Sequence, residues 1–143
     1  MIIDDYIELQ DKYQKEYGER TIFLMEVGSF YEYYGIIKIP PGKTEQDMDE
    51  EEKLKNRWGQ LWNVSSDGVL KSHISRRGNW KHKPYMAGFP NHAIDKHLDM
   101  LLKASYTVVI MNQCAYNTKD PERYIEGIYS PGINTANLTY ESN

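Results

Sequence analysis

The sequence predicts an α/β domain in which a mixed β-sheet is flanked by helices. Short apolar and β-branched runs alternate along the 143 residues with amphipathic stretches of helical spacing, and turn-forming residues separate the two kinds of segment. A chain of this length buries about 68–70% of its unfolded surface, enough for one domain with its own core. We place this domain at residues 1–133 and expect residues 134–143, which are poor in apolar side chains, to form a C-terminal linker.

The first third of the chain predicts a helix and then a strand. Asp4 or Asp5 can cap the helix, whose apolar and aromatic residues recur at near-helical spacing, and Gly18 can end it. The run from Thr21 to Val27 is apolar enough for a buried strand. Pro40-Pro41-Gly42 then interrupts the chain.

The signals between residues 43 and 75 are weaker. Residues 43–55 are polar and are expected to form either a flexible insertion or a short exposed helix. The apolar residues between Trp58 and Val64 are expected to pack as a short helix or turn against the sheet. Ser65-Ser66-Asp67-Gly68 is typical of a turn, and the alternation of apolar and polar residues from Val69 to Ser75 predicts a half-buried strand.

The C-terminal half contains the strongest helix signal. Asn91 can cap this helix directly after Pro90, and its apolar face follows the spacing i, i+4, i+7 and i+8. Two β-branched runs, Thr107 to Met111 and Tyr124 to Tyr129, predict further strands, and Ser130-Pro131-Gly132 predicts a turn. The residues of the apolar helix face are Ile94, Leu98, Leu101 and Leu102.

Composition excludes several classes of protein. Hydrophobic content of 40% and charged content of 27% are ordinary for a globular protein. The single cysteine, Cys114, excludes an internal disulfide framework and a thiolate zinc site, and we expect it to be a small buried residue. No run approaches 18 apolar residues and no export signal is visible, so we expect an intracellular protein without a membrane partner.

The charges are unevenly distributed, although the formal net charge is only −4. Six acidic residues crowd the segment 45–52, whereas the stretch from Gly68 to Ile94 is basic and contains no acidic residue. The basic stretch could face phosphates, or both segments could be solvated loops of opposite sign. The basic residues are Lys71, Arg76, Arg77, Lys81 and Lys83.

The sequence Gly28-Ser29-Phe30-Tyr31-Glu32 places an aromatic ring and a carboxylate directly after a buried run. Phe30 and Glu32 are two residues apart, so in an extended segment they lie on one face and Tyr31 lies on the other. A flat ring beside an acid can stack on a nucleic-acid base and also touch its edge, and Gly28 lets the main chain approach a ligand. From spacing alone, a core aromatic at a strand end is the favoured interpretation of Phe30, and Glu32 could be a solvated acid beside a tyrosine cluster.

These residues resemble the Gly-x-Phe-Tyr-Glu element in the first, mismatch-recognising domain of the MutS family of DNA mismatch-repair proteins. Residues 86–93, Met-Ala-Gly-Phe-Pro-Asn-His-Ala, are similar to the family's Met-Ala-Gly-x-Pro-x-His-Ala element. Gln113, Arg123 and Ser130-Pro131-Gly132 match further family positions in the same order. The resemblance covers roughly residues 6–132, and the acidic segment 43–55 departs from it, which indicates a divergent branch.

The resemblance implies a DNA-binding module whose ligand is double-stranded DNA with a mismatch or small loop. Phe30 would enter the minor groove and stack on a mispaired or unpaired base, where opening the duplex costs less than at a sound step. Glu32 would hydrogen-bond that base, donating to a purine N7 when protonated or accepting from a thymine imino N–H when ionised. The implied DNA-binding residues are Gly28, Ser29, Phe30, Glu32, Met86 and His92, with Arg76, Arg77, Lys81 and Lys83 as candidate phosphate contacts. For residues 86–92, a tight turn and helix start needed only by the fold is an equal alternative.

The resemblance also implies that this chain is not an enzyme and holds no cofactor or metal. ATP and Mg²⁺ are expected only in the full-length protein, where the family's phosphate loop lies in a distant domain; the remaining MutS domains and a dimer partner would hold the duplex. Two alternatives stay open. One is a sequence-tolerant single-strand DNA or RNA-binding module. The other is a nuclease-like α/β domain, since Glu51-Glu52-Lys53 has the residue types of metal-dependent nucleases.

Overall fold

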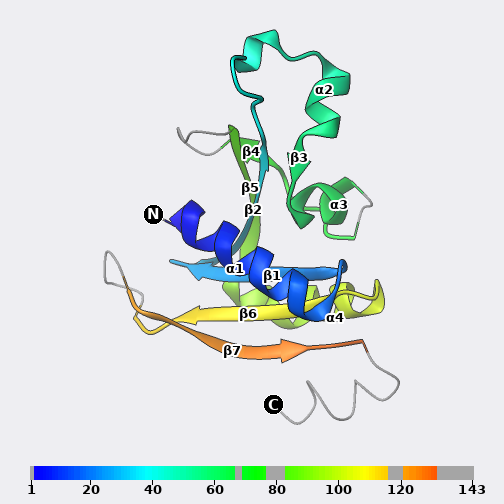
Figure 1. Ribbon diagram of the computed structural model, residues 1–143. Helices are drawn as coiled ribbons and strands as arrows, with labels where there is room; N and C mark the ends of the chain where they lie inside the picture. The colour runs from blue at the N-terminus through cyan, green and yellow to red at the C-terminus, as the bar shows by residue number, and fades with distance from the viewer. Residues whose placement is uncertain (1, 67–68, 77–82, 116–120, 132–143) are drawn as a thin grey trace.

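One mixed β-sheet organises the chain in the computed structural model, which describes residues 2–66, 69–76, 83–115 and 121–131. The seven strands lie in the order β4-β5-β2-β1-β6-β7, and β3 pairs with β2 beside this path (Figure 1). β1 and β6 run parallel and the other neighbours run antiparallel, so the expected α/β class with a mixed sheet is confirmed. The strands are β1 (Thr21–Val27), β2 (Phe30–Ile37), β3 (Arg57–Trp58), β4 (Ser75–Arg76), β5 (Lys83–Pro90), β6 (Thr107–Gln113) and β7 (Arg123–Tyr129).

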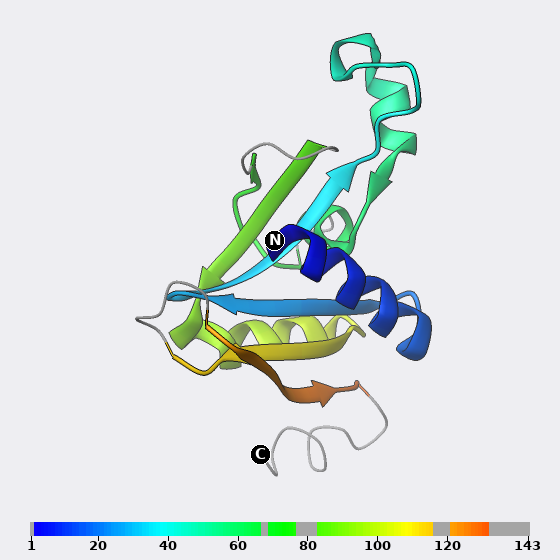
Figure 2. The same ribbon diagram turned by 60° about the vertical axis from the view of Figure 1, so that its left-hand side comes forward.

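Two long helices cover opposite faces of the central strands (Figure 1). α1 packs its tyrosines on the face of β1 that carries Phe23, and α4 packs on the face that carries Phe89 and Tyr31. α3 packs against β2. A short arm, which carries η1 and α2, projects from the sheet (Figures 1 and 2). The α-helices are α1 (Ile2–Tyr17), α2 (Glu50–Lys55), α3 (Gln60–Ser66) and α4 (Ile94–Lys103), and the 3-10 helices are η1 (Glu45–Asp47) and η2 (Asn91–Ala93).

α1 attaches to β1 through buried polar contacts as well as apolar packing. The Tyr6 hydroxyl donates to the Phe23 carbonyl at 2.6 Å, and the Tyr6 ring lies 5.3 Å from the Phe23 ring. The Gln10 side chain accepts from the Phe23 amide and donates to the Thr21 carbonyl, both at 2.8 Å. Gly18 ends the helix as expected, and its amide donates to the Gln14 carbonyl.

The two predicted helix caps are wrong. α1 already begins at Ile2 because Ile3 is buried against the core, so Asp4 and Asp5 lie within the first turn, where a negative charge still favours the helix. Asn91 starts the short η2 helix and α4 begins only at Ile94. The amphipathic face of α4 is confirmed, because its leucines are buried.

β2 and β5 are long central strands that the sequence analysis did not identify as such. They pair along eight residues, from Phe30 with Pro90 to Ile37 with Lys83. The turn and helix start considered for residues 86–92 is therefore wrong for residues 86–90, which belong to β5. The strand expected from Val69 to Ser75 is also wrong, because the amides of Val69 and Leu70 donate to the Val64 carbonyl and close the end of α3 instead.

Residues 43–55 form the helical alternative, with Asp49 capping α2 by accepting from the Glu52 amide. Ser65 and Ser66 end α3, whereas the rest of the turn predicted there lies outside the described residues. Cys114 is exposed, because it follows the last residue of β6, so its predicted burial is wrong. Gly132 and the predicted linker 134–143 also lie outside the described residues.

We expect the stability of the domain to fall at alkaline pH in part because of Tyr6. Burial raises the pKa of the Tyr6 hydroxyl well above its ordinary value of 10.0. Above that value the unfolded chain releases a proton that the folded protein keeps, so the free energy of unfolding falls as the pH rises. Tyr6→Phe should make this fall shallower. Near neutral pH the variant should lose about 1–2 kcal/mol, because the Phe23 carbonyl loses its donor.

Urea unfolding measured near neutral pH and at several values above pH 10 tests both parts of this prediction. Tyr17→Phe is the matched control, because Tyr17 is on the same helix and its side chain is exposed. It should change neither the neutral stability nor the alkaline slope. An alkaline slope that Tyr6→Phe leaves unchanged would contradict the assignment to Tyr6.

Candidate nucleic-acid interface

A two-residue turn, Gly28-Ser29, joins β1 to β2 and presents Phe30. Val27 pairs with Phe30 across this hairpin, and Gly28 has a φ of 60°, which two-residue hairpin turns accept when glycine is their first residue. Phe30 is the first residue of β2, and 46% of its surface is exposed. The interpretation of Phe30 as a core aromatic is therefore excluded, and its role in DNA binding stays a prediction.

Glu32 lies on the same face as Phe30 but is largely buried, with 6% of its surface exposed. The Tyr34 hydroxyl, also on this face, donates to Glu32 Oε1. The interpretation of Glu32 as a solvated acid is therefore wrong, because a neighbour two residues along the strand holds one of its oxygens inside the protein. A held carboxylate has a fixed direction, which suits recognition of a single group on a ligand.

The ring of Phe30 and the carboxylate of Glu32 share a pocket of about 340 Å³. β5 forms part of its wall, because Gly88 pairs with Glu32. A side chain at position 88 would not fit, since its Cβ would lie 2.6 Å from the Tyr31 carbonyl oxygen. His73 and Ser75 lie on the segment that reaches the pocket through β4, and no sequence pattern marks them as site residues. The pocket is lined by Phe30, Glu32, His73, Ser75, Met86 and Gly88.

The side chain of Gln113, at the end of β6, binds the main chain of the turn twice. Its Oε1 accepts from the Gly28 amide at 3.2 Å, and its Nε2 donates to the Gly28 carbonyl at 2.6 Å. Only 5% of the Gln113 surface is exposed. The first turn residue is therefore bonded to the sheet through one buried amide.

A buried carboxylate, Glu26, links Gln113 to the second turn residue. Glu26 Oε1 accepts from the main-chain amide of Gln113 at 3.0 Å, and Glu26 Oε2 accepts from Asn91 Nδ2 at 3.2 Å. The Asn91 amide donates to the Ser29 carbonyl at 2.7 Å, and Arg123 Nε donates to the Glu26 carbonyl at 3.0 Å. We call Glu26, Asn91, Gln113 and Arg123 the turn clamp.

Tyr31 serves the opposite face of the sheet. Its hydroxyl donates to Asn112 Oδ1, and its ring lies 5.9 Å from the Phe89 ring. Phe89 in turn stacks on His97 of α4 at 3.9 Å between ring centroids. Tyr31 is therefore part of the core and does not line the pocket that Phe30 and Glu32 share.

The structure places the predicted basic and helical residues unevenly. Arg76 lies on β4 next to Ser75 of the pocket, is exposed, and pairs with Glu45 of the arm at 3.8 Å. His92 is exposed and follows Asn91, so its main chain lies beside the turn. Lys83 begins β5, but its side chain is outside the described part, and Arg77 and Lys81 lie outside the described residues altogether.

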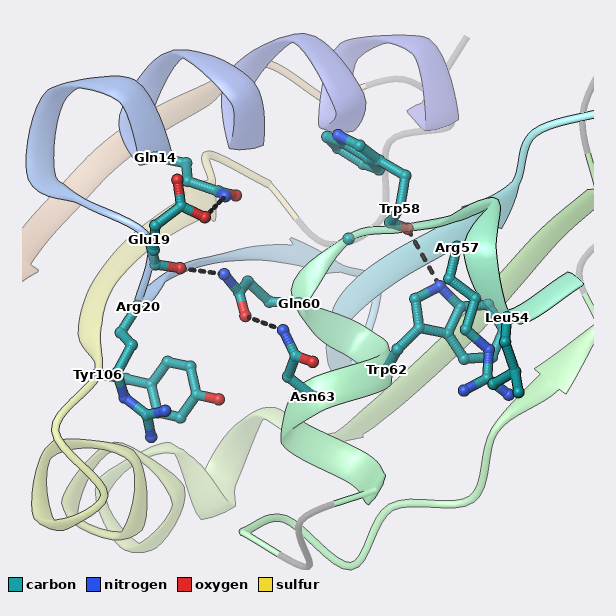
Figure 3. Close-up of a pocket in the computed structure, with 11 residues that line it drawn as sticks. Gln14, Glu19, Arg20, Leu54, Arg57, Trp58, Gln60, Trp62, Asn63 and Tyr106 are labelled. Carbon is teal, nitrogen blue, oxygen red and sulfur yellow. Dashed lines mark hydrogen bonds between the residues drawn. The ribbon is translucent and has the colours of Figure 1, made fainter. Parts of the chain in front are cut away.

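A larger pocket, of about 600 Å³, lies at the other end of β1 (Figure 3). Its amide groups already bond to each other: Gln60 donates to the Glu19 carbonyl and Asn63 donates to Gln60 at 3.0 Å. Two guanidinium groups lie over aromatic rings, Arg20 over Tyr106 at 4.1 Å and Arg57 over Trp62 at 4.5 Å from the ring centroid. Because β1 runs from this pocket to the turn, the pocket is not part of the candidate interface.

The described residues give no support to a nuclease centre. Among them, no group of three or more His, Cys, Asp or Glu side chains could hold a metal ion. Glu51 and Glu52 lie on α2 and do not line the pocket that Phe30 and Glu32 share. They pair with Lys55 at 3.2 Å and with Lys43 at 2.5 Å, respectively. In the same part of the chain, no helix is long and apolar enough to cross a membrane.

Comparison with known proteins assigns the chain to one family. Residues 66–137 match the family model described as MutS domain I. A DNA mismatch repair protein mutS homolog of Acanthamoeba polyphaga mimivirus is 30% identical over 127 residues, which span 89% of this chain and 10% of the relative. A mitochondrial DNA mismatch repair protein mutS homolog of Sarcophyton glaucum is 25% identical over 137 residues, which span 90% of this chain and 14% of that relative.

These matches identify the chain as an α/β domain of a known family. The chain belongs to the MutS domain I family. The family model begins after Phe30 and Glu32, whereas an alignment that spans 89% of this chain extends over them. The chain spans about a tenth of the length of these relatives.

We expect Tyr34→Phe to destabilise the domain by about 1–3 kcal/mol, because it removes a donor from the buried Glu32 carboxylate. Tyr33→Phe is the matched control on the same strand. The Tyr33 hydroxyl is buried near Ser65 and Ser72 but makes no hydrogen bond of good geometry. Its removal should cost little or nothing. Equal losses in the two variants, measured by urea unfolding, would contradict a specific role for the Tyr34 hydroxyl.

Proposed function

We propose that this chain is the DNA mismatch-binding module of a MutS-like repair protein, and that Phe30 inserts at a mispaired or unpaired base. The observation that carries the proposal is the exposed Phe30 ring on a hydrogen-bonded turn, beside a pocket that contains the Glu32 carboxylate. Membership of the MutS domain I family supports it, as do the names of the two relatives.

Phe30 would act as a wedge in the minor groove. An aromatic ring that stacks on a base contributes about 1–3 kcal/mol. Unstacking a sound base step costs a few kcal/mol, and a mismatch has already lost part of that energy. The wedge would therefore select the step that opens most easily, and a turn already fixed by hydrogen bonds adds no ordering cost on binding.

Glu32 would then hydrogen-bond the displaced base. Because Tyr34 holds Oε1, the other carboxylate oxygen is the one available to the ligand. An ionised oxygen accepts from an imino N–H, and a protonated one donates to a purine N7. A carboxylate close to DNA is also repelled by phosphates, so well-paired DNA, which offers Glu32 no partner, is disfavoured.

Phosphate contacts would come from basic residues around the pocket, and the module itself would be a binder without catalysis. Arg76 is the described candidate beside the pocket, and Arg77, Lys81 and Lys83 remain candidates from sequence. We propose that the other MutS domains and a dimer partner of a full-length protein hold the duplex around this module. ATP and Mg²⁺ would act only in those other domains.

A competition experiment separates this proposal from its alternatives. A labelled duplex with one G·T mismatch is bound to the chain and displaced by unlabelled mismatched duplex, matched duplex or single strand. The proposal expects the mismatched duplex to compete best. Stronger competition by single strands would favour a single-strand or RNA-binding module, and magnesium-dependent cleavage of the labelled DNA would identify a nuclease.

We expect Phe30→Ala to lose the preference for mismatched over matched duplex while the domain stays folded. The loss should correspond to about 1–3 kcal/mol of stacking, because the exposed ring contributes little to the core. Binding titrations with both duplexes, together with circular dichroism, measure the two effects. Tyr124→Ala is the matched control, since Tyr124 is an exposed aromatic residue on β7. A wedge role is contradicted if both variants lose the preference equally.

We expect Arg76→Ala to weaken matched and mismatched duplex alike. Loss of one phosphate contact should lower the slope of log affinity against log salt by about one. Glu45→Ala should act in the opposite direction on affinity, because it releases Arg76 from an ion pair. Titrations at several salt concentrations test both variants. A slope that Arg76→Ala leaves unchanged would exclude Arg76 as a phosphate contact.

A further inference from the structure

We propose that Gln113 is a positioning residue for the wedge: it fixes the direction in which Phe30 leaves the sheet without touching DNA. The inference rests on the proposed function of Phe30. Its basis is geometric, because the side-chain amide of Gln113 forms hydrogen bonds with both main-chain polar groups of Gly28, at 3.2 and 2.6 Å. Phe30 follows Gly28 by only two residues, so the orientation of this turn sets the orientation of the ring.

The bonding of the turn is unusual for a two-residue hairpin. Such turns usually lie at the surface, where water satisfies their outward polar groups. Here the Gly28 amide, the Gly28 carbonyl and the Ser29 carbonyl are all bonded to protein groups, the last of them to the Asn91 amide at 2.7 Å. Burying the side-chain amide of Gln113 is unfavourable unless both its oxygen and its nitrogen are hydrogen-bonded, so the position of this side chain is well defined.

The rest of the turn clamp fixes Gln113 and Asn91 relative to each other. One oxygen of the Glu26 carboxylate accepts from the main-chain amide of Gln113 at 3.0 Å, and the other accepts from the Asn91 side chain at 3.2 Å. The two residues that bond the turn are thus joined through one buried side chain. Glu26 pairs with Tyr31, so its carboxylate points to the α4 side of the sheet, opposite to Phe30.

The physical consequence concerns the cost of binding. A wedge on a mobile hairpin must become ordered when it inserts, and that cost reduces affinity for the inserted state. Matched duplex, which does not accept the wedge, would not involve this cost. Loss of Gln113 should therefore reduce the preference for a mismatch while leaving binding to matched duplex nearly unchanged.

The chain contains a matched control for this residue. Gln10 is also buried, and its side-chain amide also bonds one main-chain amide and one carbonyl, those of Phe23 and Thr21, each at 2.8 Å. Both glutamines thus bond the main chain of β1 or the turn that follows it, but Gln10 does so at the end of β1 far from Phe30. Gln10→Ala should destabilise the fold without changing the mismatch preference.

The first experiment compares Gln113→Ala, Gln113→Glu and Gln10→Ala in titrations with matched and mismatched duplexes, at a temperature where all remain folded. We expect Gln113→Ala to lower the mismatch preference roughly tenfold, as loss of two hydrogen bonds allows. Gln113→Glu keeps the acceptor for the Gly28 amide but lacks the donor for its carbonyl, so it should also lower the preference. Equal preferences in Gln113→Ala and Gln10→Ala would overturn the inference.

A second measurement needs no DNA and separates failure of this inference from failure of the proposed function. Hydrogen exchange at the Gly28 amide should become faster in Gln113→Ala and stay unchanged in Gln10→Ala. Unchanged exchange in Gln113→Ala would overturn the positioning role. A parent chain that shows no mismatch preference at all would overturn the proposed function and, with it, the inference, even if Gly28 exchange responds.

The double variant Phe30→Ala with Gln113→Ala completes the test. If Gln113 acts through the ring, the double variant should have the same mismatch preference as Phe30→Ala alone. A further, additive loss in the double variant would show that Gln113 affects DNA binding by another route, and the inference would be wrong.

Discussion

The rest of the structure depends on how β1 pairs: it runs parallel to β6 on one side and antiparallel to β2 on the other. β6 runs parallel to β1 from Thr21 to Met25, and β2 turns back antiparallel from Val27. Because parallel strands end at the same edge of a sheet, the last residue of β6 arrives beside the turn that follows β1. Gln113 therefore meets Gly28 as a direct result of the strand register.

The alternation of side chains along β1 and β2 then divides the tasks between the two faces. Glu26 and Tyr31 point to the α4 side, where they bond the turn clamp and the core. Phe30, Glu32 and Tyr34 point to the other side, where the ring is exposed and the carboxylate is held by a hydroxyl.

The sequence predicted those parts of the fold that depend on local signals. β1 has the predicted bounds, and the leucine face of α4 is buried as expected. β5 was not predicted because Pro84, Gly88 and Pro90 are turn signals. In the sheet, Gly88 instead allows a close approach to the Tyr31 carbonyl.

In the candidate site, too, the sequence predicted only the residues that have local signals. The segment from Gly28 to Glu32 was identified from its residue types and a family resemblance, whereas Glu26 and Asn91 were not, since their role appears only when distant strands pair. Burial of Glu32 depends on Tyr34, a same-face neighbour two residues along, and that spacing was visible in the sequence. The pairing of Arg76 with Glu45 could not be foreseen, because the two residues are 31 positions apart and no local signal brings them together.

The 85 positions that separate Gly28 from Gln113 have a consequence for how this hairpin comes into being. Contacts between residues so far apart in sequence form late in folding, because the intervening chain must first be closed into a loop. During synthesis, the hairpin is made long before the residue that secures it. The same dependence means that the hairpin is not a portable motif: transplanted into another protein without β6, it would keep its sequence and lose its direction.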